Sequence, residues 1–275
     1  MATSLKPPGK EPSLFLRHFG GQVRILRERR GLTRDELGGL ASCSGSLIGA
    51  IERGERIADP DFAVRLDTAL VAEGLLASAG PALAAERYPP MFRDFALLEA
   101  DCFSFSTYAP HAVPGLLKTE SYAHALIGNR IPSLDDDETN GLVKARLDRQ
   151  ALLARTPKPV LTFAIEEAVL RRPFGGRVVL KEQLLHLLAC SRLRHVSVQV
   201  MPIDCEEHAG TDGLLTLLET KDRRPLAYTE GQGGSTLISD RDQVSLLIQR
   251  YGAIRAQALT PRESARYIEQ LVGAL

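Results

Sequence analysis

The sequence has no excess of charge of either sign. Its 275 residues contain 34 lysines and arginines and 34 aspartates and glutamates, so the formal net charge at pH 7 is zero. Residues 1–90 are nearly balanced as well, with 12 basic and 11 acidic side chains. A polycation that binds nucleic acid over its whole surface is therefore excluded, and any nucleic-acid interface must be a local patch.

Paired cysteines and long apolar runs are also missing. The four cysteines, Cys43, Cys102, Cys190 and Cys205, are scattered and form no C-x-x-C pair. We therefore expect reduced thiols in a cytoplasmic protein, with neither a disulfide frame nor a zinc site, and we predict no cofactor. No stretch approaches the ~18 apolar residues of a membrane-spanning helix, and no apolar run follows the first lysines. We expect no membrane association and no signal peptide.

Residues 33–54 carry the strongest pattern in the chain. Thr33 followed by Glu36 is a capping box, which predicts the start of a short helix. The small residues 41–43 favour a turn, and Ser44 is a good N-cap for a second helix that Gly54 ends. Two short helices joined by a tight turn are typical of a helix-turn-helix, whose second helix enters the major groove of DNA.

Three further helices are predicted around this motif. The first runs from Ser13 to Arg30, although Gly20 and Gly21 interrupt its pattern. Another begins at Asp59-Pro60, and a short fifth helix covers 73–79. We expect residues 1–12 to be a flexible arm and residues 13–79 to form an all-α five-helix bundle.

Arginines gather on the outer side of the first helix and just after it. A cluster of this kind neutralises phosphates when it lies beside a DNA-reading helix, although such runs are often merely solvated. The predicted phosphate contacts are Arg24, Arg27, Arg30, Arg34 and Arg56.

Residues 21–70 resemble the Cro/repressor-like (XRE-type) helix-turn-helix superfamily over their full length. The matching positions are Leu26-Arg27, Gly31-Leu32-Thr33, Glu36-Leu37, Ser44, Ile48, Ile51-Glu52, Gly54 and Arg56. The resemblance implies binding to double-stranded DNA, usually as a homodimer. It also implies a structural role for Glu52 and a phosphate contact for Arg34.

The predicted recognition helix departs from that family in its side chains. Its candidate base-reading residues are Ser44, Gly45, Ser46, Ala50 and Arg53. Bidentate reading of guanine or adenine needs Arg, Lys, Asn or Gln, and none of these occurs before Arg53. Either specificity comes from few contacts and DNA shape, or binding has weakened.

The second half of the chain predicts a different architecture. Gly80-Pro81 and Pro89-Pro90 punctuate a predicted linker over residues 80–90. Alternating apolar residues and caps after it predict a mixed α/β domain over 91–275, with several helices and a small sheet of about six strands. We expect one long helix from the acidic run at 135–138 to about Arg155.

Candidate chemistry in this second domain is sparse. Residues 205–208, Cys-Glu-Glu-His, form the best local cluster for a metal, but such loops are usually just polar. Glu166 and Glu230 each end a predicted strand, which would make them a carboxylate pair if they met at one sheet edge. The residues 231–234 resemble a hairpin turn more than a phosphate loop. No catalytic motif is found, and we predict that the protein is not an enzyme.

Several motifs of the second domain resemble the C-terminal domain of actinomycete-type helix-turn-helix regulators. These motifs lie at residues 108–126, 143–153, 166–176, 183–188, 196–202 and 210–219. The resemblance implies a toxin–antitoxin-like transcriptional regulator, often encoded beside small partner proteins. We expect the second domain to sense a small-molecule effector, bind a small partner protein or dimerise. The alternative is a repressor-fold protein that has lost DNA recognition and uses its α/β domain for small-molecule binding or catalysis.

Overall fold

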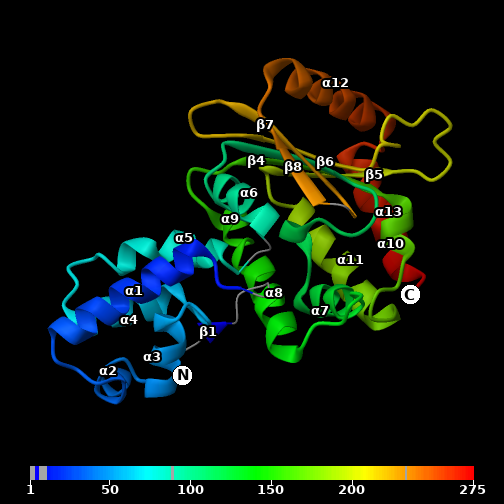
Figure 1. The fold of residues 1–275 in the computed structure, drawn as a ribbon. Coiled ribbons are helices and arrows are strands. Elements are labelled where there is room, and N and C mark those ends of the chain that lie inside the picture. Colours follow the sequence, from blue (N-terminus) through cyan, green and yellow to red (C-terminus); the bar gives the residue numbers. More distant parts are fainter. Residues whose placement is uncertain (1–3, 6–10, 88–89, 233) are drawn as a thin grey trace. The chain divides into compact units, whose positions relative to one another are not determined.

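The computed structural model describes residues 4–5, 11–87, 90–232 and 234–275. The chain divides into two compact units (Figure 1). The first comprises residues 1–97 together with 135–145, and the second comprises residues 98–134 and 146–275. The first unit is helical and the second is built on a β-sheet, as the sequence predicts.

The helices of the first unit begin at side-chain caps. The N-caps of its first four helices are Ser13, Thr33, Ser44 and Asp59, and each accepts a hydrogen bond from a backbone N–H of the first turn. The elements are α1 (Leu14–Arg29), α2 (Arg34–Leu40), α3 (Gly45–Glu52), α4 (Pro60–Leu70), the 3-10 turn η1 (Ala77–Ala79), α5 (Gly80–Ala85) and α6 (Pro90–Ala100). The predicted count of five helices is therefore not exact.

Helix α1 continues without a break through Gly20 and Gly21. A Cβ atom on Gly20 would lie 2.3 Å from the carbonyl oxygen of Ile51 and 2.6 Å from that of Glu52. Gly20 is thus the point at which the backbone of α1 approaches the end of α3. The glycine that weakens the helical pattern in the sequence is required by packing.

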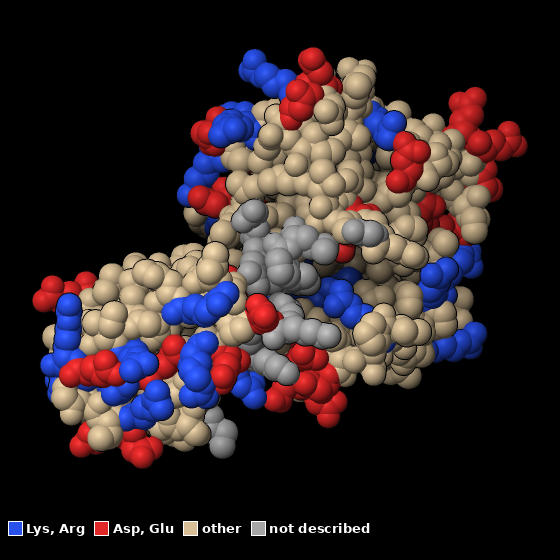
Figure 2. All heavy atoms as spheres, in the orientation of Figure 1, with Lys and Arg blue, Asp and Glu red and all other residues tan. Residues whose placement is uncertain are grey.

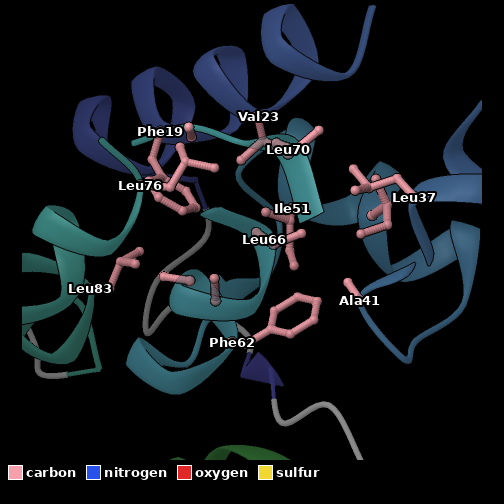
Figure 3. Close-up of a cluster of buried hydrophobic side chains, with 14 of the residues drawn as sticks. Phe19, Val23, Leu37, Ala41, Ile51, Phe62, Leu66, Leu70, Leu76 and Leu83 are labelled. Atoms are coloured by element: carbon pink, nitrogen blue, oxygen red, sulfur yellow. The ribbon is translucent and has the colours of Figure 1, made fainter. Parts of the chain in front are cut away.

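One apolar cluster holds helices α1 to α5 together. Phe19 and Val23 of α1, Leu37 of α2 and Ile51 of α3 all have at most 2% of their surface exposed (Figure 3). Helix α4 contributes Phe62, among others. Because α2 and α3 are both anchored in this core, their mutual arrangement is fixed.

Residues 71–87 differ from the prediction of a short helix followed by a linker. The buried carboxylate of Asp67 accepts hydrogen bonds from the backbone N–H groups of Gly74, Leu76 and Ala77, which bends the chain into a turn. Helix α5 follows, and its Leu83 is fully buried in the core. The boundary between the units falls after Leu97 instead, and Tyr88 and Pro89 lie outside the described residues.

The structure describes two short parts of the predicted flexible arm, residues 4–5 and 11–12. Strand β1 (Ser4–Leu5) pairs antiparallel with β2 (Ile57–Ala58), so this part of the arm has a fixed partner. Residues 11 and 12 lead into α1. The rest of the arm, residues 1–3 and 6–10, lies outside the described residues.

The second unit contains a six-stranded mixed sheet. Its strands are β3 (Ser104–Ala109), β4 (Val160–Glu166), β5 (Val196–Met201), β6 (Leu214–Glu219), β7 (Pro225–Gly231) and β8 (Gly234–Ile238). Their order is β5-β4-β3-β6-β7-β8. Strands β3, β4 and β5 are parallel, whereas β6, β7 and β8 continue antiparallel from β3.

Helices cover both faces of this sheet, with α12 on one face and α11 on the other (Figure 1). The helical elements after α6 are η2 (Gly115–Leu117), α7 (Glu120–Gly128), α8 (Asp136–Asp148), α9 (Ala151–Ala154), α10 (Glu167–Arg171), α11 (Arg177–Ser191), α12 (Arg241–Gln257) and α13 (Pro261–Gly273). The long helix predicted to reach Arg155 is interrupted between α8 and α9. There the side chain of Gln150 donates to the carbonyl of Lys118 at 2.6 Å.

Candidate DNA interface

Helices α2 and α3 and the turn between them form the predicted helix-turn-helix. The capping box is present: Thr33 Oγ1 accepts from the N–H of Glu36 at 3.2 Å, and the Glu36 carboxylate accepts from the N–H of Thr33 at 2.7 Å. Ser44 caps α3 by accepting from the N–H of Leu47 at 3.2 Å. The left-handed residues Gly31 (φ 67°) and Gly54 (φ 74°) follow the ends of α1 and α3.

Glu52 at the end of α3 connects three helices. Its side chain is only 1% exposed and accepts from Arg27 Nε of α1 at 2.5 Å and from Arg34 Nε of α2 at 2.8 Å. Burial alone would raise the pKa of the Glu52 carboxyl, but the hydrogen bonds and charges of the two arginines outweigh burial and hold that pKa below its usual value. The structural role implied for Glu52 thus has a physical basis.

The predicted base-reading residues fall into two groups. Ser44 and Ser46 are exposed and lie 2.9 Å apart at their hydroxyls, Ala50 is half-buried, and Arg53 is exposed. Gly45 is buried instead, because a Cβ atom there would lie 2.0 Å from Asp35 Oδ1. The base-reading prediction for Gly45 is therefore replaced by a packing role between α2 and α3.

Arg53 is already engaged within the protein. Its Nε and one terminal nitrogen donate to the two carboxylate oxygens of Glu55 at 2.8 and 2.7 Å. Both side chains are about half exposed, with 53% and 52% of their surface accessible. This exposed pair would have to open before Arg53 used its full donor fork on a base.

The predicted phosphate residues are also placed differently from one another. Arg24 is exposed and pairs with Glu28 at 2.8 Å, and Arg30 is exposed and donates to the carbonyl of Ala69 at 2.6 Å. Arg34 keeps 45% of its side chain exposed. Arg56 is half-buried, 3.9 Å from Asp137 of α8.

Arg27 does not fit the phosphate role. Its side chain is 10% exposed and donates to Glu52 and, at 2.9 Å, to the carbonyl of Leu32. Moving this guanidinium to a phosphate would leave Glu52 buried without its closest counter-charge. Within the run of arginines on α1, Arg27 is therefore the member that faces inward, and its contacts favour a structural role over the predicted phosphate contact.

The charges on the helical unit are mixed rather than collected in one basic area. Figure 2 shows Lys and Arg atoms interspersed with Asp and Glu atoms over the visible face of this unit. Some basic side chains of this unit are also paired with acidic ones, as Arg24 is with Glu28 and Arg53 is with Glu55. Electrostatic attraction to DNA therefore depends on particular side chains and not on a net charge.

The second unit brings together three polar side chains that the sequence did not associate. Tyr108 of β3 donates to Glu166 Oε1 at 2.8 Å, and His208 Nε2 lies 2.8 Å from the same oxygen. The N–H of Gly210 donates to His208 Nδ1 at 2.8 Å, which places the ring proton on Nε2 facing Glu166. Burial, followed by the hydrogen bond to Glu166, raises the pKa of Tyr108.

This cluster replaces two sequence hypotheses. His208 faces Glu166 instead of joining Cys205 in a metal site, and Glu166 has Tyr108 and His208 as partners rather than Glu230. Among the described residues, no group of three or more His, Cys, Asp or Glu side chains is arranged to hold a metal ion. The three residues join the loop at 208–210 to strands β3 and β4.

Lys118 is a second polar feature that the sequence did not reveal. It is 7% exposed and follows the buried turn η2. Burial, and then the positive charges of Arg146 and Arg149, lower the pKa of its ammonium to about 7. The signal in the sequence is only a lysine beside two leucines, which gives no indication of burial.

The membrane prediction can be compared with the described helices. In the parts of the chain that the structure covers, none of them is both long and apolar enough to cross a bilayer.

Comparison with known families finds one match in each half of the chain. Residues 18–79 match a family model described as a helix-turn-helix domain, which indicates a DNA-binding regulator. Residues 92–270 match a second model, described as a domain of unknown function (DUF5753). The chain belongs to this DUF5753 family, whose model covers more than half of it. No curated protein and no solved structure matches the chain.

Proposed function

We propose that this protein is a sequence-specific transcriptional regulator that inserts α3 into the major groove of DNA. The observation that carries the proposal is the α2–turn–α3 unit, in which Ser44 and Ser46 are exposed while Glu52 ties the far end of α3 to α1 and α2. A recognition helix that is rigid before binding loses little conformational entropy on docking.

Phosphate contacts would come from the exposed and half-buried arginines around this unit. Arg24, Arg30, Arg34 and Arg56 remain candidates, whereas Arg27 is excluded by its burial. Ser44 and Ser46 each offer single hydrogen bonds, and Ala50 offers a methyl group to thymine. DNA shape would supply part of the specificity.

We assign the helical unit to the Cro/repressor-like (XRE) type and infer that the protein binds as a homodimer. A dimer of this type reads two half-sites about 34–36 Å apart, which is one turn of DNA. The second domain would dimerise, sense a small molecule or bind a small partner protein, in a cytoplasmic, toxin–antitoxin-like regulator. Light scattering of the free protein and of its DNA complex tests the dimer.

The competing proposal is a repressor fold that no longer recognises DNA. The absence of amide and guanidinium groups at Ser46 and Ala50 favours it. The second domain would then bind or transform a small molecule. This candidate gains weight if the full chain fails to distinguish DNA sequences.

The deciding experiment is a titration of the full-length protein into labelled DNA from its own upstream region and into a scrambled duplex, at two salt concentrations. The proposal predicts tighter binding to the upstream DNA that survives moderate salt. Ser46→Ala should alter sequence preference more than overall affinity, and exposed Ser78→Ala, on η1, is the matched control. Equal and salt-sensitive binding to both duplexes would contradict a specific regulator.

A further inference from the structure

An arginine from α2 lies against the surface of α3 at a position where α3 has no side chain. Gly49 is the fifth residue of α3 and is buried although it belongs to the helix surface around Ala50. A Cβ atom on Gly49 would lie 3.5 Å from Arg34 Cδ, 3.6 Å from Arg34 Nε and 3.3 Å from a terminal nitrogen of Arg53. The Arg34 side chain therefore lies directly over Gly49.

Arg34 is held there by a buried acceptor. Its Nε donates to Glu52 Oε2 at 2.8 Å, and the other carboxylate oxygen of Glu52 is occupied by Arg27 Nε. This arrangement fixes the middle of the Arg34 side chain. Within the ranges that the structure describes, neither terminal nitrogen of Arg34 donates a hydrogen bond, and 45% of the side chain is exposed.

The other exposed arginines present their donors differently. In Arg53, Nε and one terminal nitrogen donate hydrogen bonds to Glu55. One terminal nitrogen of Arg30 donates to the carbonyl of Ala69. Arg24 pairs with Glu28, whose side chain is itself about half exposed. Arg34 thus combines a buried acceptor on Nε with two terminal nitrogens that donate no hydrogen bond within the described residues.

We propose that Arg34 reads a guanine in the major groove, with its two terminal nitrogens donating to O6 and N7. The proposal rests on DNA binding through α3 as argued above. An end-on guanidinium is the commonest specific reader of guanine, and it needs a fixed stem to discriminate. Because the side chain of Arg34 lies against Gly49 of α3, it would enter the groove together with that helix.

This assignment explains how a helix without a bidentate base-reading side chain near its start could still recognise a base. Ser46, Gly49 and Ala50 cannot form a bidentate contact with any base, but Arg34 supplies one from the neighbouring helix. A Cβ atom at position 49 would already be in contact with Arg34, so a side chain larger than alanine there would have to displace it. On this proposal, the glycine at position 49 makes room for the base-reading arginine, and its lack of a side chain does not weaken DNA recognition.

The test is a selection of bound duplexes from a randomised pool by the full-length protein, followed by titration of the selected duplex and of its single-base variants. We compare wild type with Arg34→Lys and Arg34→Gln, and we use Arg24→Gln as the matched control because Arg24 is exposed and forms its ion pair with Glu28 of its own helix. Circular dichroism and thermal unfolding confirm that each variant is folded. If Arg34→Gln does not fold, Arg34→Lys, which keeps the charge beside Glu52, carries the test.

The wild type should prefer guanine at one position of each half-site by roughly tenfold or more. Arg34→Gln should lose that preference. Arg34→Lys should weaken it, because lysine lacks the planar fork of the guanidinium, and should keep the salt dependence of wild type. Arg24→Gln should bind all duplexes more weakly and keep the preference.

Two other results overturn the inference and are distinguishable from each other. A uniform loss of affinity in the Arg34 variants, with the guanine preference intact, would make Arg34 a phosphate contact and leave the proposed function standing. A wild type that selects no sequence would contradict the proposed function itself and, with it, any base-reading role.

Discussion

Arg27 and Glu52 form an ion pair across 25 residues of sequence, with 2.5 Å between Nε and Oε1. The pair joins α1 to the end of α3, and the two side chains are 10% and 1% exposed. Removing one partner of such a pair leaves the other charged and buried, which costs more than the pair itself contributes.

We therefore expect Glu52→Gln to lower the free energy of unfolding by about 3 kcal/mol. Urea unfolding followed by circular dichroism measures this. Glu55→Gln removes the partner of Arg53 from an exposed pair and should leave the midpoint nearly unchanged. Equal effects of the two substitutions would show that Glu52 does not hold the helices together.

Gly20 and Gly21 should respond in opposite directions to alanine. A Cβ on Gly20 meets backbone carbonyl oxygens of α3 at 2.3 and 2.6 Å, so Gly20→Ala should cost about 2 kcal/mol or more. A Cβ on Gly21 has no heavy atom within 4 Å, so Gly21→Ala should stabilise the protein by about 0.5–1 kcal/mol through helix propensity. Thermal unfolding of the two variants measures both changes in stability. A stabilising effect of Gly20→Ala would contradict the close approach of α1 to α3.

The buried Lys118 predicts a dependence of stability on pH. Its pKa is lowered to about 7 in the folded chain, so near neutral pH the unfolded chain binds a proton that the folded chain partly releases. Lys118→Met removes that penalty and should stabilise the protein at pH 7 by on the order of 4 kcal/mol, and by a smaller amount at pH 8.5, where the unfolded chain binds less of the proton.

Urea unfolding of wild type and Lys118→Met at both pH values measures this difference. Lys181→Met, at an exposed position of α11, is the control and should shift stability equally at the two pH values. A stability difference for Lys118→Met that does not change with pH would mean that Lys118 is not titrating in a buried site.

Local signals in the sequence were sufficient to locate most helix starts and strands. Thr33, Ser44 and Thr260 cap helices because their hydroxyls bond to backbone groups only two or three residues away, and such short-range chemistry is readable from sequence. Strands β3, β4 and β5 follow from alternation or apolar runs in the same way. These features do not depend on how the elements pack together.

Features that depend on distant partners were not predictable. Nothing near Arg27 in the sequence indicates that it faces Glu52 while its neighbours face solvent. The packing of Leu83 into the core likewise turned an apparent linker into a helix, because Gly80-Pro81 can begin a helix as well as a turn. The contact of Glu166 with His208 and Tyr108 could be predicted only if the order of the strands in the sheet were known.

Hydrogen exchange of the full-length protein, with and without a duplex selected from a randomised pool, tests the central claim most directly. The account predicts that binding slows exchange of the backbone amides of residues 44–53 and of the turn before them. Protection confined to the second unit, or an unchanged pattern over α2 and α3 at saturating DNA, would contradict recognition through α3.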